Sequence, residues 1–312
     1  MIEDSPFISS LIPNFPTELL EHDRNSKKPR VAIVGADHTL PMVSAKEAVF
    51  KNIMTPILIG RGETIYSIAK ELRWDISEYE VINADSEQEA AKIGVKLCGT
   101  KSADILMKGQ VHTDLFIKAV LGKDAQLLTG KRLVHIFHIT HPKGSKPLLI
   151  SDAAVNVSPD IQTRKDAAYH VVNLLKSLGN KNPRIAFLSA TESLIESIPS
   201  SIEARELSDW CSINISGARF SGPLALDTIL SSQAAKEKGL FNDPVTGKAD
   251  AIIVPDIVSG NALFKSLVYL SGGCAAGLVL GAKVPLLLTS RADPPVARVA
   301  SISLASKVIK SG

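Results

Sequence analysis

Short runs of apolar, often β-branched residues recur along the chain, and longer stretches of helical character separate them. Runs of this length that end near glycine or polar residues are typical of buried strands. Strands are predicted in the segments 30–38, 55–60, 103–109, 133–139, 147–160, 184–190, 249–257 and 284–290. Helices are predicted between them, for example at 44–53 and 163–179. This alternation predicts an α/β fold of parallel β-α-β units, with helices on both faces of the sheet.

Polar residues follow directly after several of these apolar runs. They are Lys108–Gly109, Ser151–Asp152, Thr191–Glu192, Pro255–Asp256 and Ser290–Arg291. Because open parallel sheets bind ligands at the carboxyl ends of their strands, these positions predict a cleft at that edge. Two prolines follow the last pair, and we expect them to stop any immediate helix.

Composition narrows the class of protein. A chain of 312 residues is long enough for two domains or one large one. Its formal charge is only +3, from 35 Lys and Arg against 32 Asp and Glu, and aromatic residues make up 5%. This balance disfavours nucleic acid as a partner and suits a small anionic ligand held by a few local cations.

Cysteine usage and hydropathy predict a soluble, cytoplasmic protein. The three cysteines, Cys98, Cys211 and Cys274, are far apart and match no metal-binding or redox spacing, which favours a reducing compartment. The first ten residues lack the basic start and apolar run of a secretory signal. The most apolar segment, 273–288, contains Lys283 and is shorter than the ~20 residues of a membrane helix.

Several local motifs do not require a catalytic, metal-binding or phosphate-binding role. His135, His138 and His141 recur every third residue, but in a strand the first two point to opposite faces and the outer two lie ~20 Å apart, so no metal site is predicted. The glycine-rich segment 271–283 lacks the lysine and hydroxyl of a phosphate loop, and its glycines are predicted to serve tight helix packing. No G-x-S-x-G nucleophile motif occurs.

Five polar and glycine-containing strings at the ends of apolar segments form a more specific pattern. They are MKGQVHTD (107–114), SDAAVNVSPD (151–160), SGPLALD (221–227), VPDIVSGNALFK (254–265) and LLLTSRAD (286–293). Their order and spacing resemble the phosphate acetyltransferase and phosphate butyryltransferase family from about residue 100 to the end, and more weakly from about residue 30. The TSRAD string looks more like the butyryl branch.

The resemblance implies a fold, an activity and an assembly. Enzymes of this family exchange an acyl group between coenzyme A and inorganic phosphate, with acyl-CoA as substrate and no tightly bound cofactor. The implied fold has two parallel-sheet α/β domains with an interdomain cleft, similar to isocitrate and isopropylmalate dehydrogenases. The first domain would comprise residues 1–138 and 265–312, and the second residues 139–264. A homodimer is expected by analogy, and no membrane or nucleic acid partner.

The resemblance also assigns candidate residues. Ser290, Arg291 and Asp293 are the implied catalytic residues. A guanidinium such as Arg291 can bind two phosphate oxygens at once, and the Ser290 hydroxyl can donate to a developing oxyanion. The implied substrate and coenzyme-binding residues are Lys108, Gly109, His112, Thr113, Lys118, Asp152, Asn156, Asn261 and Lys265.

One departure from the family pattern concerns the base. Acetyl members place an aspartate seven residues after the serine, whereas this chain has Ala297. A thiol with a pKa near ~8.5 is largely protonated at pH 7, a handicap of roughly 2 kcal/mol. Asp293, His112 or nearby cations are the candidates to compensate. Two alternatives stay open: a catalytically weak coenzyme A-binding protein, and a metal-dependent dehydrogenase of the same fold.

Overall fold

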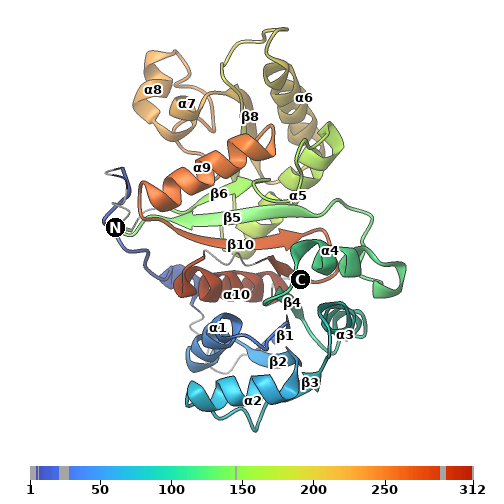
Figure 1. Ribbon diagram of the computed structural model, residues 1–312. Helices are drawn as coiled ribbons and strands as arrows, with labels where there is room; N and C mark the ends of the chain where they lie inside the picture. Colours follow the sequence, from blue (N-terminus) through green and yellow to red (C-terminus); the bar gives the residue numbers. More distant parts are fainter. Residues whose placement is uncertain (1–4, 6, 21–27, 145, 289–292, 311–312) are drawn as a thin grey trace. The chain divides into compact units, whose positions relative to one another are not determined.

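The computed structural model describes residues 5, 7–20, 28–144, 146–288 and 293–310 (Figure 1). The predicted catalytic residues Ser290 and Arg291 lie outside these residues. The chain divides into two compact units. Unit 1 comprises residues 1–13 and 132–275, and unit 2 comprises residues 14–131 and 276–312.

The described residues of unit 2 form six strands in the order β3-β2-β1-β4-β11-β10, with β10 entering the unit at Ala276. Their bounds are β1 (Arg30–Val34), β2 (Thr55–Gly60), β3 (Glu80–Asn83), β4 (Ile105–Lys108), β10 (Cys274–Leu280) and β11 (Leu286–Leu288). The pairs are parallel except that β10 runs antiparallel to β11. The strand interiors are almost fully buried, as the apolar runs predict.

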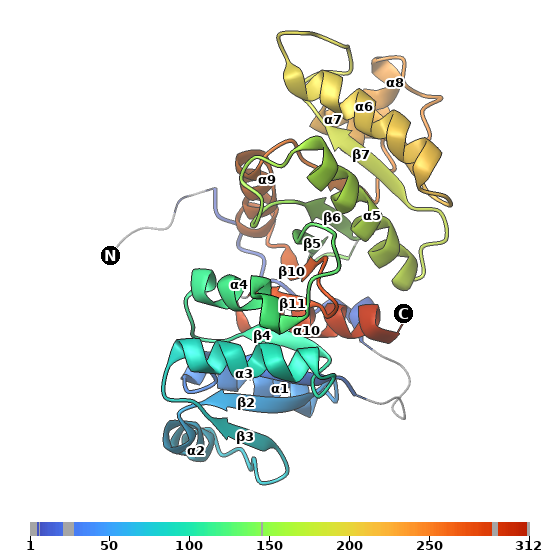
Figure 2. The same ribbon diagram turned by 90° about the vertical axis from the view of Figure 1, so that its right-hand side faces the viewer.

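Among its described residues, unit 2 also has five helices. They are α1 (Thr39–Phe50), α2 (Gly62–Glu71), α3 (Glu87–Gly99), α4 (Thr113–Leu121) and α10 (Pro295–Lys310), with short 3-10 turns η1 (Thr17–Leu19) and η2 (Lys123–Ala125). Helix α3 begins with a reciprocal cap: the Ser86 hydroxyl accepts from the Glu89 N–H at 3.2 Å, and the Glu89 carboxylate accepts from the Asp85 N–H at 2.9 Å. Figure 2 shows α3 and α4 side by side over the strands.

In the part of unit 1 that the structure describes, five strands lie in the order β5-β6-β9-β7-β8. Their bounds are β5 (Val134–Thr140), β6 (Leu148–Ser151), β7 (Arg184–Leu188), β8 (Arg219–Leu224) and β9 (Ala251–Ile253). The helices are α5 (Ile161–Ser177), α6 (Pro199–Asn214), α7 (Leu226–Leu230), α8 (Ser232–Glu237) and α9 (Ile257–Tyr269). The pairs are parallel except that β5 runs antiparallel to β6. Ile150, Ala186 and Ile252 form part of a fully buried core.

The predicted α/β fold with a mostly parallel sheet is confirmed, and two local expectations are wrong. The segment 271–283 was expected to pack helices, but it contains strand β10. Its Gly277 N–H donates to the Ser301 hydroxyl at 2.9 Å, which joins the strand to helix α10. The prolines before residue 296 do not stop a helix, because α10 begins at Pro295, where no N–H is needed.

The apolar segment 273–288 forms β10, a connection and β11 rather than a helix. Among the described residues, no helix is long and apolar enough to cross a membrane.

Candidate functional site

Strands β4 and β11 bring two of the predicted polar strings to one edge of the sheet in unit 2. Their parallel register pairs Leu288 with Lys108, so both strands end at the same level. Lys108 is 8% exposed, and its ammonium group donates to the Val111 carbonyl at 3.0 Å. In the sequence, Ser290 and Arg291 therefore follow β11, and the neighbouring strand β4 ends in the buried Lys108.

Gly109 is required by the close approach of two loops. Its N–H donates to the Val34 carbonyl at 2.8 Å. A Cβ at this position would lie 2.5 Å from the Gly35 carbonyl oxygen and 2.8 Å from that of Val34. Since both neighbours are backbone atoms, any side chain would push the loop after β4 away from the loop after β1.

His112 and Thr113 lie where helix α4 begins. The backbone N–H and the ring Nδ1 of His112 both contact Glu87 Oε2, each at 2.8 Å. Partial burial opposes ionisation of Glu87, but the bonds from His112, with the charges of His112 and Lys108, hold its pKa below the ordinary value. Thr113 is the first residue of α4 and is exposed. Glu87 thus fixes the entry of α4 at the strand edge.

A pocket of about 240 Å³ opens at the carboxyl ends of β1, β2, β3 and β4. Its lining includes Gly35, Asp37, Arg61, Glu87 and Gln110. Asp37 and Arg61 form an ion pair at 2.8 Å, in which the carboxylate is much the less exposed partner. A concave polar site therefore lies at the edge where parallel sheets bind ligands.

Asp293 and Ala297 lie at the start of α10. The Asp293 carbonyl accepts from Arg298 Nε at 3.2 Å. Arg298 is 3% exposed, and burial lowers its pKa while Asp293 acts in the opposite direction. Ala297 is 5% exposed. The buried Arg298 therefore holds Asp293, the last residue of the string that contains Ser290.

In unit 1, Asp152 organises the loop after β6. Its carboxylate is 2% exposed and accepts four hydrogen bonds. The donors are the N–H groups of His135, Ala154 and Val155, each at 2.9 Å, and Asn156 Nδ2 at 2.6 Å. All four donors belong to this chain, so in the structure Asp152 stabilises the loop after β6. Its contact with substrate stays a prediction.

The loop after β6 and helix α9 bring together three further predicted residues. Asn156 Nδ2 also donates to the Leu133 carbonyl at 2.8 Å, and Asn261 Nδ2 donates to the Ala153 carbonyl at 3.3 Å. A Cβ on Gly260 would lie 2.8 Å from the Asp152 carbonyl oxygen, so glycine allows α9 to contact this loop. Lys265 is exposed one turn beyond Asn261, on the same side of α9.

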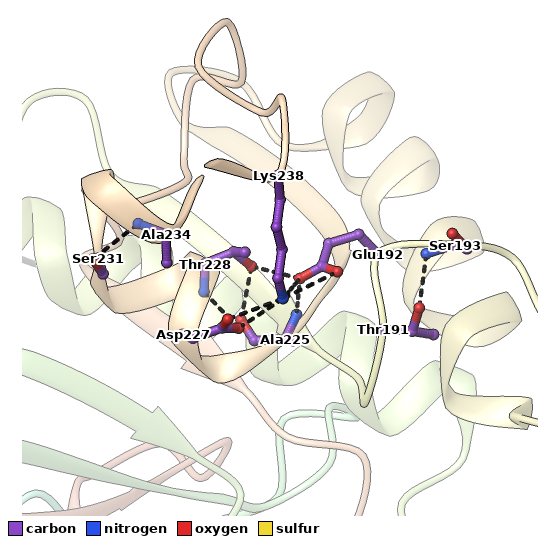
Figure 3. Close-up of polar contacts among 9 residues, drawn as sticks. All are labelled: Thr191, Glu192, Ser193, Ala225, Asp227, Thr228, Ser231, Ala234 and Lys238. Atoms are coloured by element: carbon purple, nitrogen blue, oxygen red, sulfur yellow. Dashed lines mark hydrogen bonds and ion pairs between the residues drawn. The ribbon is translucent and has the colours of Figure 1, made fainter. Parts of the chain in front are cut away.

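A second polar cluster lies at the carboxyl ends of β7 and β8 (Figure 3). Lys238, which caps the C-terminus of α8, contacts Glu192 at 3.2 Å and Asp227 at 2.9 Å, and the Thr228 hydroxyl donates to Glu192 at 2.9 Å. Burial opposes ionisation of Glu192, but the bonds from Thr228, Lys238 and the Ala225 N–H lower its pKa. The aspartate of the SGPLALD string is thus an anchor for α7 and α8.

Sequence reasoning missed Glu87 and Arg298. Glu87 had a detectable signal, because serine followed three residues later by glutamate marks a helix start with acidic residues in its first turn. Arg298 had none, since one arginine in a helical stretch does not reveal its burial. The remaining predicted residue, Lys118, lies on α4 and lines a pocket shared with α3.

Polar loops at the carboxyl ends of mostly parallel strands define an α/β protein of the class that binds small ligands at this edge. Residues 87–305 match the family model described as phosphate acetyl/butaryl transferase. The chain belongs to this family of transferase enzymes, which confirms the resemblance.

Individual relatives agree with this assignment. The chain is 39% identical to the phosphate acetyltransferase of Rickettsia prowazekii (strain Madrid E), over 98% of this chain and 87% of the relative. It is 33% identical to the phosphate butyryltransferase of Clostridium acetobutylicum (strain ATCC 824), over 93% and 97%. Its fold is similar to a branched-chain phosphotransacylase from Enterococcus faecalis V583, with a TM-score of 0.79 at 28% identity over 90% and 99%.

Proposed function

We propose that this protein exchanges a short-chain acyl group between coenzyme A and inorganic phosphate by direct transfer. The observation that carries the proposal is the register of β11 against β4. Strand β11 ends at Leu288, the partner of Lys108, and the TSRAD string follows Leu288 in the sequence. A buried lysine and a polar pocket lie at the same edge of the sheet. An anionic substrate suits such an edge.

The catalytic roles follow from the chemistry of the three residues. Arg291 binds phosphate through two parallel, charge-assisted hydrogen bonds. Ser290 donates a hydrogen bond to the oxygen of the tetrahedral intermediate as negative charge develops on it. Asp293 is the carboxylate next to this pair in sequence and is a candidate to take the thiol proton.

Nine residues are proposed to bind the substrates and coenzyme A: Lys108, Gly109, His112, Thr113, Lys118, Asp152, Asn156, Asn261 and Lys265. The cations among them suit the phosphates of the coenzyme, and the amides suit its polar groups.

The proposed architecture follows the family resemblance. It has two domains, residues 1–138 with 265–312 and residues 139–264, with the substrates in a cleft between them, as in isocitrate and isopropylmalate dehydrogenases. We propose a cytoplasmic homodimer without a tightly bound cofactor. Relatives named for acetyl and for butyryl transfer both match, so the butyryl preference inferred from TSRAD remains a proposal.

Because residue 297 is alanine, another group must accept the thiol proton. Because Ala297 is 5% exposed, a carboxylate introduced there would be largely buried and costly unless it were paired. Asp293 and His112 are the candidate acceptors. His112 is an exposed imidazole held by a carboxylate, and such a contact orients the ring.

A thiol-release assay tests the proposal. Acetyl-, propionyl- and butyryl-CoA are each incubated with the protein and phosphate, with and without EDTA. We expect phosphate-dependent release of coenzyme A that EDTA does not lower. Binding of coenzyme A without release from any of the three would support the alternative of a catalytically weak binding protein. No release, together with metal-dependent activity in a dehydrogenase assay, would favour the dehydrogenase alternative.

A further inference from the structure

One carboxylate joins the starts of helices α3 and α4. Glu87 lies in the first turn of α3, and His112 immediately precedes α4. The Oε2 atom of Glu87 contacts both the backbone N and the ring Nδ1 of His112, each at 2.8 Å. The imidazole is therefore held in one orientation, although its side chain is 65% exposed.

These contacts decide which ring nitrogen of His112 carries the hydrogen. Burial opposes ionisation of Glu87, but the bonds from His112 and the charges of His112 and Lys108 hold its pKa below the ordinary value. Because an ionised carboxylate can only accept hydrogen bonds, Nδ1 must be the donor. In the neutral ring, Nε2 then has the free lone pair, and the exposure of the side chain lets a substrate reach it.

The pair of Glu87 and His112 lies at the edge of the sheet where the reaction is proposed to occur. His112 follows Lys108, the last residue of β4, by four positions, and β4 ends level with β11. Glu87 also lines the polar pocket at the carboxyl ends of β1, β2, β3 and β4. Its position therefore suits a role in the reaction as well as in the start of α4.

Asp293, the other candidate acceptor, is the weaker base. Ordinary pKa values are about 8.5 for a thiol, about 6.5 for an imidazole and about 3.9 for an aspartate, so a thiol proton moves to an imidazole at a much smaller cost. Buried Arg298 also acts electrostatically on Asp293, and a neighbouring guanidinium favours the ionised carboxylate further. An oriented imidazole is thus the better acceptor.

We propose that Glu87 is a positioning residue that holds His112 as the acceptor of the thiol proton, an inference that rests on the proposed function. When coenzyme A attacks an acyl phosphate, Nε2 takes the thiol proton and the sulfur forms a bond to the carbonyl carbon. The bond between that carbon and the phosphate oxygen breaks. The imidazolium then gives its proton to the departing phosphate, which leaves as hydrogen phosphate, so His112 is neutral again.

Charged groups on the other elements that meet here can also influence the pH dependence. They are Glu89 in the first turn of α3, Lys108 at the end of β4, Asp114 in the first turn of α4, and His38, Asp85 and the Asp37–Arg61 ion pair in the adjoining pocket. Glu87 differs from Glu89 by its direct contact with the ring, whereas Glu89 accepts from the Asp85 N–H. A change at Glu87 is therefore expected to move the pH profile more than a change at Glu89.

Glu87→Gln tests the positioning role. Glutamine keeps an oxygen that can accept from the His112 N–H but removes the charge, so the start of α4 should be retained. With coenzyme A and acetyl phosphate as substrates, we expect kcat at neutral pH to fall at least about tenfold, with little change in either KM. The acid limb of kcat/KM should move to lower pH, because a carboxylate no longer stabilises the imidazolium.

Two further variants complete the kinetic test. His112→Gln removes the acceptor and should lower kcat by about 10²-fold or more. Glu89→Gln is the matched control, because it lies in the same turn and glutamine can replace glutamate in this helix cap. We expect its kinetics and pH profile to equal those of the wild type.

Nitrogen NMR of the histidine rings in the full chain adds a measurement without turnover. We expect the Nδ1–H tautomer for His112 in the wild type and in Glu89→Gln, and loss of this preference in Glu87→Gln. The His112 signals are those missing from His112→Gln.

The outcomes separate the possible roles. An unmoved pH profile in Glu87→Gln, whatever its stability, would mean that Glu87 only anchors α4. Near-native turnover of His112→Gln would exclude His112 as the acceptor, and an Nε2–H tautomer in the wild type would contradict the proposed orientation. The Nδ1–H tautomer in a protein without acyl exchange would refute the proposed function, while confirming that Glu87 orients the ring.

Discussion

A guanidinium and an ammonium carry the same charge, but only the guanidinium presents two parallel N–H groups to a phosphate. Arg291→Lys is therefore expected to weaken phosphate binding and turnover by roughly 1.5–3 kcal/mol, the contribution of a hydrogen bond to a charged group. Ser290→Ala removes a donor that acts chiefly as charge develops, so turnover should fall about 10²-fold with little change in coenzyme affinity. Both Michaelis constants and the thermal midpoint are measured for each variant.

Two outcomes would contradict these roles. Near-native turnover in both variants would mean that neither residue belongs to the catalytic machinery. A strongly lowered thermal midpoint in either variant would indicate a structural role instead.

At the level of elements, contacts with backbone carbonyls hold the loop after β4 in place. The Lys108 ammonium binds the Val111 carbonyl, and Gly109 lies against the carbonyls of Val34 and Gly35. Strand β11 ends beside this loop. A shift of the loop would therefore disturb both stability and the proposed phosphate site.

Gly109→Ala tests this arrangement. The added methyl group would meet two carbonyl oxygens at 2.5 and 2.8 Å, so we expect the free energy of unfolding to fall by about 1–3 kcal/mol, with a rise in the KM for phosphate. Chemical denaturation and steady-state kinetics measure the two effects. Gly62→Ala is the control, because its Cβ would meet only Asn83 Oδ1 at an ordinary 3.5 Å. Equal stability of the two variants would refute the close approach.

At the level of the whole molecule, acid sensitivity is expected to originate in unit 1. His135 and His138 of β5 are buried, and burial lowers the pKa of each from 6.5 to about 4, with Asp152 opposing the shift at His135. Both ring nitrogens of His138 are buried without a hydrogen-bond partner among the described residues. Folding therefore keeps these rings neutral at a pH where the unfolded chain would protonate them.

The sign of the pH dependence follows from linkage. Above pH 6.5 the rings are neutral in both states, and as the pH falls from 6.5 towards 4 only the unfolded chain takes up protons, which lowers the free energy of unfolding. Between pH 6.5 and 4.5, each histidine contributes a loss of roughly 2–3 kcal/mol, at 1.36 kcal/mol per pH unit. His138→Leu should reduce the loss by this amount, as measured by urea denaturation across the range. His38→Gln, at an exposed position, is the control, and an identical loss in His138→Leu and wild type would exclude His138 as its source.

The sequence by itself determined the alternation of strands and helices, because the spacing of apolar residues is a local property. It also determined the family, because the polar strings at the strand ends are local as well. It also placed Lys108, Gly109 and Ser290 in polar strings at the ends of apolar runs, without showing that β4 and β11 are neighbours. Only the tertiary structure decided which polar groups are buried and which hydrogen-bond partners they have. Asp152 binds four internal donors, Arg298 is buried, and 271–283 contains a strand. These outcomes depend on contacts between segments far apart in the chain, which hydrophobic periodicity does not record.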